Sequence, residues 1–149
     1  MNVVDERTKK TLGTLAPGNV GADLSLEGSL VETVQKAVGE GLTRMNFKPS
    51  SVRAGGGHEL RIEIRNLDYT TIRGFWAGTL RVDAGLKAIC VREGMRPYEK
   101  LHTGEFVESV QVVQSKEANA RYISTALSSA VNALLADKEL IECLAQGAT

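Results

Sequence analysis

Residues 79–92 read TLRVDAGLKAICVR, and this stretch carries the clearest strand pattern in the chain. Every second residue from its start is apolar or small: Leu80, Val82, Ala84, Leu86, Ala88 and Cys90. Such alternation predicts a strand with one face packed on the core and one face largely exposed to solvent. This is typical of an antiparallel sheet that helices cover on one side. Because the strand is long and glycine weakens a strand interior, we expect a bend at Gly85.

The segments around this strand predict partners for it. Residues 60–69 also alternate, but their phase slips by one before Leu67, which indicates a β-bulge near Asn66. On the other side, Glu93-Gly94 is a hairpin turn signal. Residues 98–113 then predict a further strand, which we expect to be broken near Gly104, and residues 1–5 predict a short strand at the start of the chain.

Helical patterns flank the strands. Ser29 and Glu32 form a capping-box pattern ahead of apolar residues at spacing four: Leu30, Val34, Val38 and Leu42. Charged residues repeat at the same spacing on the opposite side of the helix, and we interpret them as a solvated face: Glu32, Lys36, Glu40 and Arg44. Near the end of the chain, Ser115 is expected to cap a second long helix, and Asp137 to start a short terminal one.

These patterns predict an α+β fold with a single domain over residues 1–149. We expect a largely antiparallel twisted sheet of about four to five strands, with two main helices packed on one face. The predicted element order is β-α-(β)-β-β-β-α-α.

Composition excludes several classes of protein. Hydrophobic residues make up 42% of the chain and charged residues 24%, which is typical of a globular domain. Lys plus Arg equals Asp plus Glu at 18 each, so we expect no nucleic-acid partner, because phosphate binding needs uncompensated cations. No apolar run approaches the roughly 18 residues of a membrane span. Because residues 1–10 are charged and hold no apolar run, we expect no signal peptide there.

Residues that could support chemistry are sparse. Cys90 and Cys143 lack CxxC or Cys/His neighbourhoods, so we expect two free thiols, with a disulfide as the alternative in an oxidising compartment. His58 and His102 have no second ligand at a useful spacing, and we expect both at the surface. Gly55-Gly56-Gly57 precedes a strand and not a helix, so it is a loop and not a phosphate cradle. We therefore expect no catalytic residues, no metal and no cofactor.

Five residues are candidates for contact with a partner. Phe75 and Trp76 lie at a turn between glycines, where they either anchor a partner or lipid headgroup or fold back onto the end of the sheet. Arg81, Asp83 and Lys87 would lie on the wet face of the sheet. Outside this group, Asp5 and Arg7 share a side of an extended chain, and a structural ion pair is the favoured role for them.

The whole arrangement resembles the YajG family of bacterial envelope lipoproteins, whose function is uncharacterised. The resemblance rests on Asp5-x-Arg7-Thr8, the helix SLVETVQKAVGEGLTRMNF, the strand LRIEIRNLDY and the closing helix ISTALSSAVNALLADKEL with its break at Asp137. The resemblance implies a domain of one sheet and helices that is tethered by lipid and faces the periplasm. It implies no catalytic residues that could be assigned to positions in this sequence. The resemblance also implies a signal peptide that ends in an acylated Cys, and we expect neither feature within residues 1–149.

Three functional hypotheses follow. The first is a non-enzymatic accessory module that binds an unknown envelope protein, or a second copy of itself, through the wet face or an unpaired edge of the sheet. The second is a small-molecule or lipid carrier, with a pocket between sheet and helices at four small residues: Ala84, Ala88, Ala126 and Ala130. The third and least favoured is a hydrolase whose site is assembled from distant residues.

Overall fold

The computed structural model describes residues 1–12, 29–49, 58–73, 77–110 and 115–146. The elements are β1 (Asn2–Asp5), α1 (Leu30–Arg44), β2 (Glu59–Arg73), β3 (Gly78–Arg92), β4 (Met95–Val110), α2 (Lys116–Leu135) and α3 (Lys138–Ala145). Among the described residues four strands form one sheet in the order β1-β2-β3-β4. This confirms the predicted α+β class, and the sheet has four of the expected four to five strands. Strand β1 runs parallel to β2, whereas the other neighbours are antiparallel.

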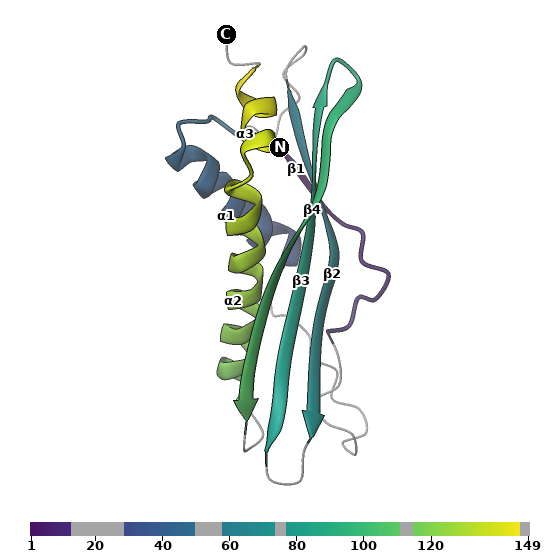
Figure 1. Cartoon of the computed structure of the whole chain (residues 1–149), viewed down its shortest axis with the longest axis vertical. Coiled ribbons are helices and arrows are strands. Elements are labelled where there is room, and N and C mark those ends of the chain that lie inside the picture. Colours follow the sequence, from purple (N-terminus) through teal and green to yellow (C-terminus); the bar gives the residue numbers. More distant parts are fainter. Residues whose placement is uncertain (13–28, 50–57, 74–76, 111–114, 147–149) are drawn as a thin grey trace.

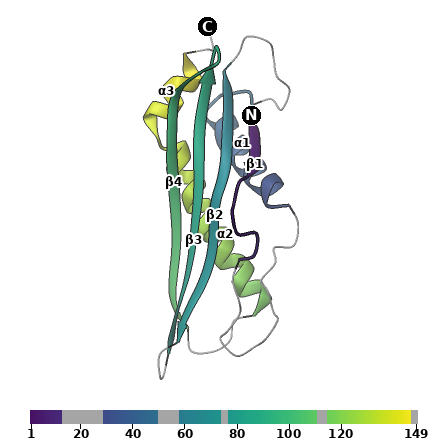
Figure 2. The same cartoon turned by 90° about the vertical axis from the view of Figure 1, so that its right-hand side faces the viewer.

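The helices cover one face of the sheet, as predicted. Figure 1 shows α1 and α2 side by side along that face, and Figure 2 looks onto the opposite face with the helices behind the sheet. The core lies between the two layers, and the inward residues of β3 that the sequence indicated are at most 1% exposed: Leu80, Val82, Ala84, Leu86, Ala88 and Cys90. The alternation in residues 79–92 therefore assigned the packed face correctly.

Strand β2 contains the predicted bulge. Ile64 pairs with Leu86 and Asn66 pairs with Gly85, so one residue of β2 is extra at this point. The Asn66 side chain lies over Gly85, because a Cβ added there would be 2.0 Å from Asn66 Oδ1. Gly85 therefore makes room for the bulge, while β3 itself continues from Gly78 to Arg92.

The turn between β3 and β4 follows its sequence signal. Glu93 has φ 51° and Gly94 has φ 79°, and a two-residue hairpin turn of type I′ requires positive φ at both central residues. Arg92 and Met95 pair directly on either side of the turn. The register shifts by one residue between Arg92 and Cys90, and beyond this shift the two long strands pair continuously from Cys90 with Tyr98 to Gly78 with Val110.

The expectation of a break near Gly104 is wrong. Strand β4 runs unbroken from Met95 to Val110, and Gly104 pairs with Ala84 in its middle. A Cβ at Gly104 would lie 2.1 Å from the Ala126 carbonyl oxygen and 2.3 Å from the Ala130 amide nitrogen. The glycine is present because the backbone of α2 packs against the strand here, and not because the strand ends.

Each helix begins at the predicted cap. Ser29 Oγ accepts a hydrogen bond from the Glu32 amide at the start of α1, and Ser115 Oγ accepts one from the Ala118 amide at the start of α2. Asp137 Oδ1 accepts hydrogen bonds from the first amides of α3. These side-chain acceptors satisfy backbone donors that a helix start otherwise leaves unpaired.

The expectation of two free thiols is wrong. Cys90 of β3 and Cys143 of α3 form a disulfide across 53 residues of chain. Their spacing in the sequence gave no sign of this, because the bond depends on α3 packing back over the sheet. The disulfide joins the last helix covalently to the central strand.

Candidate interaction surface

Three of the predicted contact residues lie on the uncovered sheet face, and they pair with one another or with neighbours. Arg81 Nε is 2.8 Å from Asp83 Oδ2, and its Nη2 is 3.4 Å from Glu105 Oε2. Lys87 forms an ion pair with Glu99 of β4. These charged side chains therefore pair with one another on an exposed face, where solvent screens the ion pairs and each contributes little to stability. Phe75 and Trp76, like the Gly55–Gly57 loop, lie outside the described residues.

Large apolar side chains occur on the same face, and the sequence reasoning missed them. Ile72 is 65% exposed, and Leu101 and Val107 are each 51% exposed. Leu101 pairs with Lys87 and Val107 pairs with Arg81, so these apolar side chains alternate with the ion pairs. The pattern of residues 98–113 does not show which of their side chains face the core. Only the pairing with β3 shows which side chains of β4 face outward.

Three carboxylates form a row across this face. Asp68 pairs with Asp83, and Asp83 pairs with Glu105 on the far strand. The Arg81 guanidinium neutralises two of them, and Asn66 Nδ2 is 3.5 Å from Asp68 Oδ2. In the part of the chain that the structure describes, no group of His, Cys, Asp or Glu side chains is arranged to hold a metal ion.

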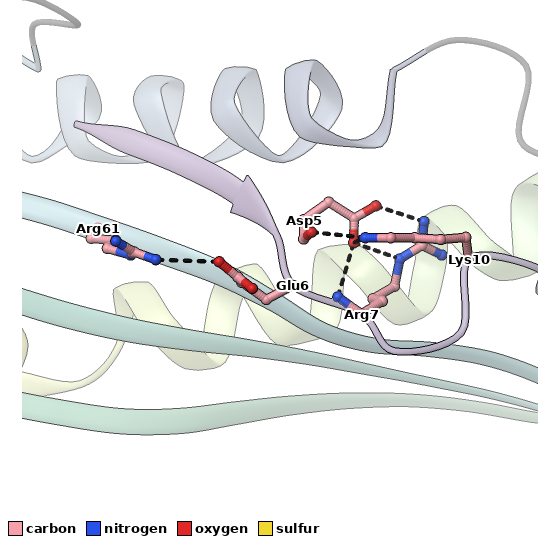
Figure 3. Close-up of polar contacts among 5 residues, drawn as sticks. All are labelled: Asp5, Glu6, Arg7, Lys10 and Arg61. Atoms are coloured by element: carbon pink, nitrogen blue, oxygen red, sulfur yellow. Dashed lines mark hydrogen bonds and ion pairs between the residues drawn. The ribbon is translucent and has the colours of Figure 1, made fainter.

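A second cluster of charges follows the end of β1 (Figure 3). Arg7 donates to both oxygens of Asp5, from Nε to Oδ1 at 2.9 Å and from Nη2 to Oδ2 at 2.9 Å. Lys10 Nζ donates to the Asp5 backbone carbonyl at 2.8 Å and lies 3.2 Å from its carboxylate. Arg7 is buried, so the predicted structural ion pair is confirmed, and it fixes the direction of the chain beyond β1.

This cluster shifts the ionisation of Asp5. The hydrogen bonds from Arg7 hold the pKa of the Asp5 carboxyl well below its ordinary value, more than offsetting the opposite effect of burial. Beside it, Glu6 pairs with Arg61 of β2 at 3.3 Å, as Figure 3 shows. The charged groups in this region hold β1 and the following turn against β2.

A third polar cluster lies between β4 and α3, and it corrects the expectation for one histidine. His102 is buried and not at the surface, and its Nε2 is 2.9 Å from the hydroxyl oxygen of Tyr98. Burial lowers the pKa of His102 and raises that of Tyr98. Lys100 Nζ donates to Asp137 Oδ2 at 2.8 Å and lowers the pKa of that carboxyl to about 2.

Asp137 connects this third cluster to the start of α3. Asp137 already accepts hydrogen bonds from the first amides of α3, so its carboxylate is committed to capping the helix. The Lys100 ion pair then attaches that cap to the edge strand. These contacts join α3 to β4.

Two pockets lie near the first residue of the chain. One, of about 990 Å³, runs over the charged side of α1 and includes Glu32, Lys36 and Glu40. The other, of about 470 Å³, lies where α1 ends, β2 begins and α3 ends. Neither is lined by the four alanines that suggested a carrier, and these residues are at most 1% exposed in the contact between helix and sheet.

No helix in the described residues has both the length and the apolar character to cross a membrane.

A family model described as "Uncharacterized lipoprotein" matches residues 1–145. No curated protein matches the chain.

The comparison with solved structures finds one with the same fold. A minor lipoprotein from Acinetobacter baumannii superposes with a TM-score of 0.53 at 8% sequence identity, covering 95% of this chain and 94% of that one. A Caulobacter crescentus CB15 protein described as a candidate lipoprotein gives a TM-score of 0.38 at 10% identity, covering 83% and 86% of the two chains. At 8% identity the likeness to the Acinetobacter protein concerns the fold alone.

Proposed function

Because the chain belongs to this family of uncharacterized lipoproteins, which indicates a location in the cell envelope, we propose that it is a non-enzymatic interaction module on the periplasmic side. Its partner would be a second envelope protein, bound on the uncovered face of the sheet. The observation that carries this proposal is the exposure of Ile72, Leu101 and Val107 on that face.

The energetics of the face favour a protein partner. Apolar side chains that stay half exposed in the isolated domain gain roughly 25 cal/mol for each Å² that a partner covers. The surrounding ion pairs would form a polar rim, since charged groups at the edge of an interface contribute orientation more than affinity. Arg81, Asp83 and Lys87 are therefore proposed to orient the partner, and Leu101 and Val107 to anchor it.

The disulfide supports the proposed compartment. Disulfides persist in the periplasm and are rare where glutathione and thioredoxin keep thiols reduced. The Cys90–Cys143 bond is consistent with a domain that matures in an oxidising environment.

Site-specific photo-crosslinking tests the proposed interface. A benzophenone amino acid at Leu101 should give a discrete crosslinked product in living cells, and the product should disappear when Val107 is changed to Asp. The same amino acid at Ser124, on the exposed side of α2, is the matched control and should give no such product.

Mass spectrometry of the product then identifies what was bound. A single envelope protein supports the proposal, whereas a crosslink between two copies of this chain would replace it with self-association. Equal crosslinking from Leu101 and Ser124 would contradict a specific site on the sheet face.

A further inference from the structure

The smaller pocket has an apolar floor and wall. Leu42 of α1 and Leu60 of β2 are buried at its base, and Phe47 and Leu144 are partly buried around it. The turn after α1 brings Phe47 to this place, because Asn46 has φ 66° and the Phe47 amide donates back to the Leu42 carbonyl at 3.0 Å. The pocket is therefore formed by residues that the fold holds in fixed positions.

The disulfide lies beside the same pocket. Leu60 pairs with Cys90 across the sheet, and Leu144 directly follows Cys143 in α3. The bond between these cysteines thus ties the α3 side of the pocket to the sheet side. A covalent tie of this kind limits how far the wall can move inward to fill the space.

Two polar side chains complete the lining. His58 Nε2 is buried and has no hydrogen-bond partner, and Lys48 is exposed at the rim. A buried polar nitrogen without a partner is costly, so an acceptor that reached it would be favoured. None of the described residues that line the pocket is acidic, so their electrostatic field favours an anion.

We propose that this pocket binds a small amphipathic anion, with an apolar chain or ring against Leu42, Phe47 and Leu144 and a carboxylate head near His58 and Lys48. The volume of about 470 Å³ falls within the range of about 300–1,000 Å³ typical of small-molecule sites. The carboxylate would accept a hydrogen bond from the Nε2–H tautomer of His58 and would pair with the Lys48 ammonium. This inference does not depend on the protein interface proposed above.

Sodium decanoate, kept below its micelle concentration, is a suitable probe. In methyl-labelled protein, the signals of Leu42, Leu60 and Leu144 should shift in a saturable way, and those of Leu80 should not. Decyltrimethylammonium has the same chain with the opposite charge, and it should bind at least tenfold more weakly.

Three variants change the lining of the pocket, and two more serve as controls. Leu144→Glu puts a carboxylate on the pocket wall and should weaken decanoate binding at least tenfold, whereas Leu101→Glu makes the same change on the open sheet face and should leave it unaltered. Lys48→Glu should weaken binding several-fold, with Lys9→Glu as the control for net charge. His58→Ala should also weaken it several-fold.

The outcomes decide the proposal even if the Leu144 variant fails to fold, because the Lys48 variant and the cationic probe test the site independently. Shifts spread over the whole surface, or equal affinity for the two probes, would overturn the proposal. The absence of saturable shifts at the pocket leucines up to millimolar decanoate would also overturn it.

Discussion

Gly104 of β4 lies against the backbone of Ala126 in α2, with room for hydrogen and no room for a methyl group. A Cβ at Gly104 would be 2.1 Å from the Ala126 carbonyl oxygen. The edge strand and the long helix therefore meet backbone to backbone at this point. Small residues at Ala126 and Ala130 have the same role on the helix side, and they bring the two layers together instead of leaving a cavity.

Replacing Gly104 with Ala should destabilise the fold strongly. The atoms it would meet belong to helix backbone, which cannot rotate away, so we expect a loss of about 3 kcal/mol in the free energy of unfolding. Urea denaturation measures this. Gly85→Ala is the matched control and should cost about 1 kcal/mol or less, because the atom it meets is the end of the Asn66 side chain, which can move. Equal losses for the two variants would contradict the proposed contact.

Removing the disulfide should weaken the attachment of α3. The bond closes a loop across 53 residues, and replacing Cys90 and Cys143 with Ala should lower the free energy of unfolding by about 3 kcal/mol. A reducing agent should produce a loss of similar size in the wild type and none in the double variant. Two titratable thiols in the denatured protein before any reducing agent is added would show that the bond is not present.

Asp5→Asn should destabilise the chain by about 2 kcal/mol at neutral pH, because it leaves the buried Arg7 without its charged partner. Asp83→Asn removes a similarly spaced partner of Arg81 on the exposed face, where solvent screens the pair, and should cost much less. Chemical denaturation of both variants gives the comparison. A larger loss for Asp83→Asn would show that burial does not decide the strength of these pairs.

The ion pair between Asp5 and Arg7 should also make the free energy of unfolding depend on pH. The pKa of Asp5 is lowered in the folded state, so its stabilising effect is present above the ordinary value of about 3.8 and is lost as pH falls below it. Wild type and Asp5→Asn should therefore approach each other in stability as pH falls from 5 to 2. A constant difference across this range would contradict the predicted shift.

His102 should produce a dependence at higher pH. Burial lowers its pKa below the ordinary 6.5, and this effect outweighs the opposite effect of the Asp137 charge. The unfolded state therefore binds the proton more readily than the folded state. The part of the stability that comes from neutral His102 is present above about pH 6.5 and declines as pH falls. Thermal unfolding from pH 8 to pH 5 should show a steeper decline in wild type than in His102→Gln, and identical slopes would contradict this.

Much of the local structure could be predicted without coordinates. Alternation identified the packed residues of β3, a phase slip located the bulge at Asn66, and Ser29, Ser115 and Asp137 marked helix starts. Each of these signals involves residues that are close together in the sequence. The paired Asp5 and Arg7 belong to the same class, since they are two residues apart.

The candidate sites could be predicted only in part. The ion-paired residues Arg81, Asp83 and Lys87 were found because they alternate with the core of β3. Leu101 and Val107 were missed, because their exposure depends on how β4 pairs with β3. The smaller pocket collects residues from three elements, so no single stretch of sequence could indicate it.

The sequence by itself determined the α+β class, the helix starts and the packed face of the central strand, because hydrophobic period and capping act between near neighbours in the chain. Only the tertiary structure decided the disulfide, the backbone contact at Gly104 and the burial of His102, because each depends on where α2 or α3 packs over the sheet. Such contacts join residues that lie far apart in the chain, and local patterns hold no information about the distance between them.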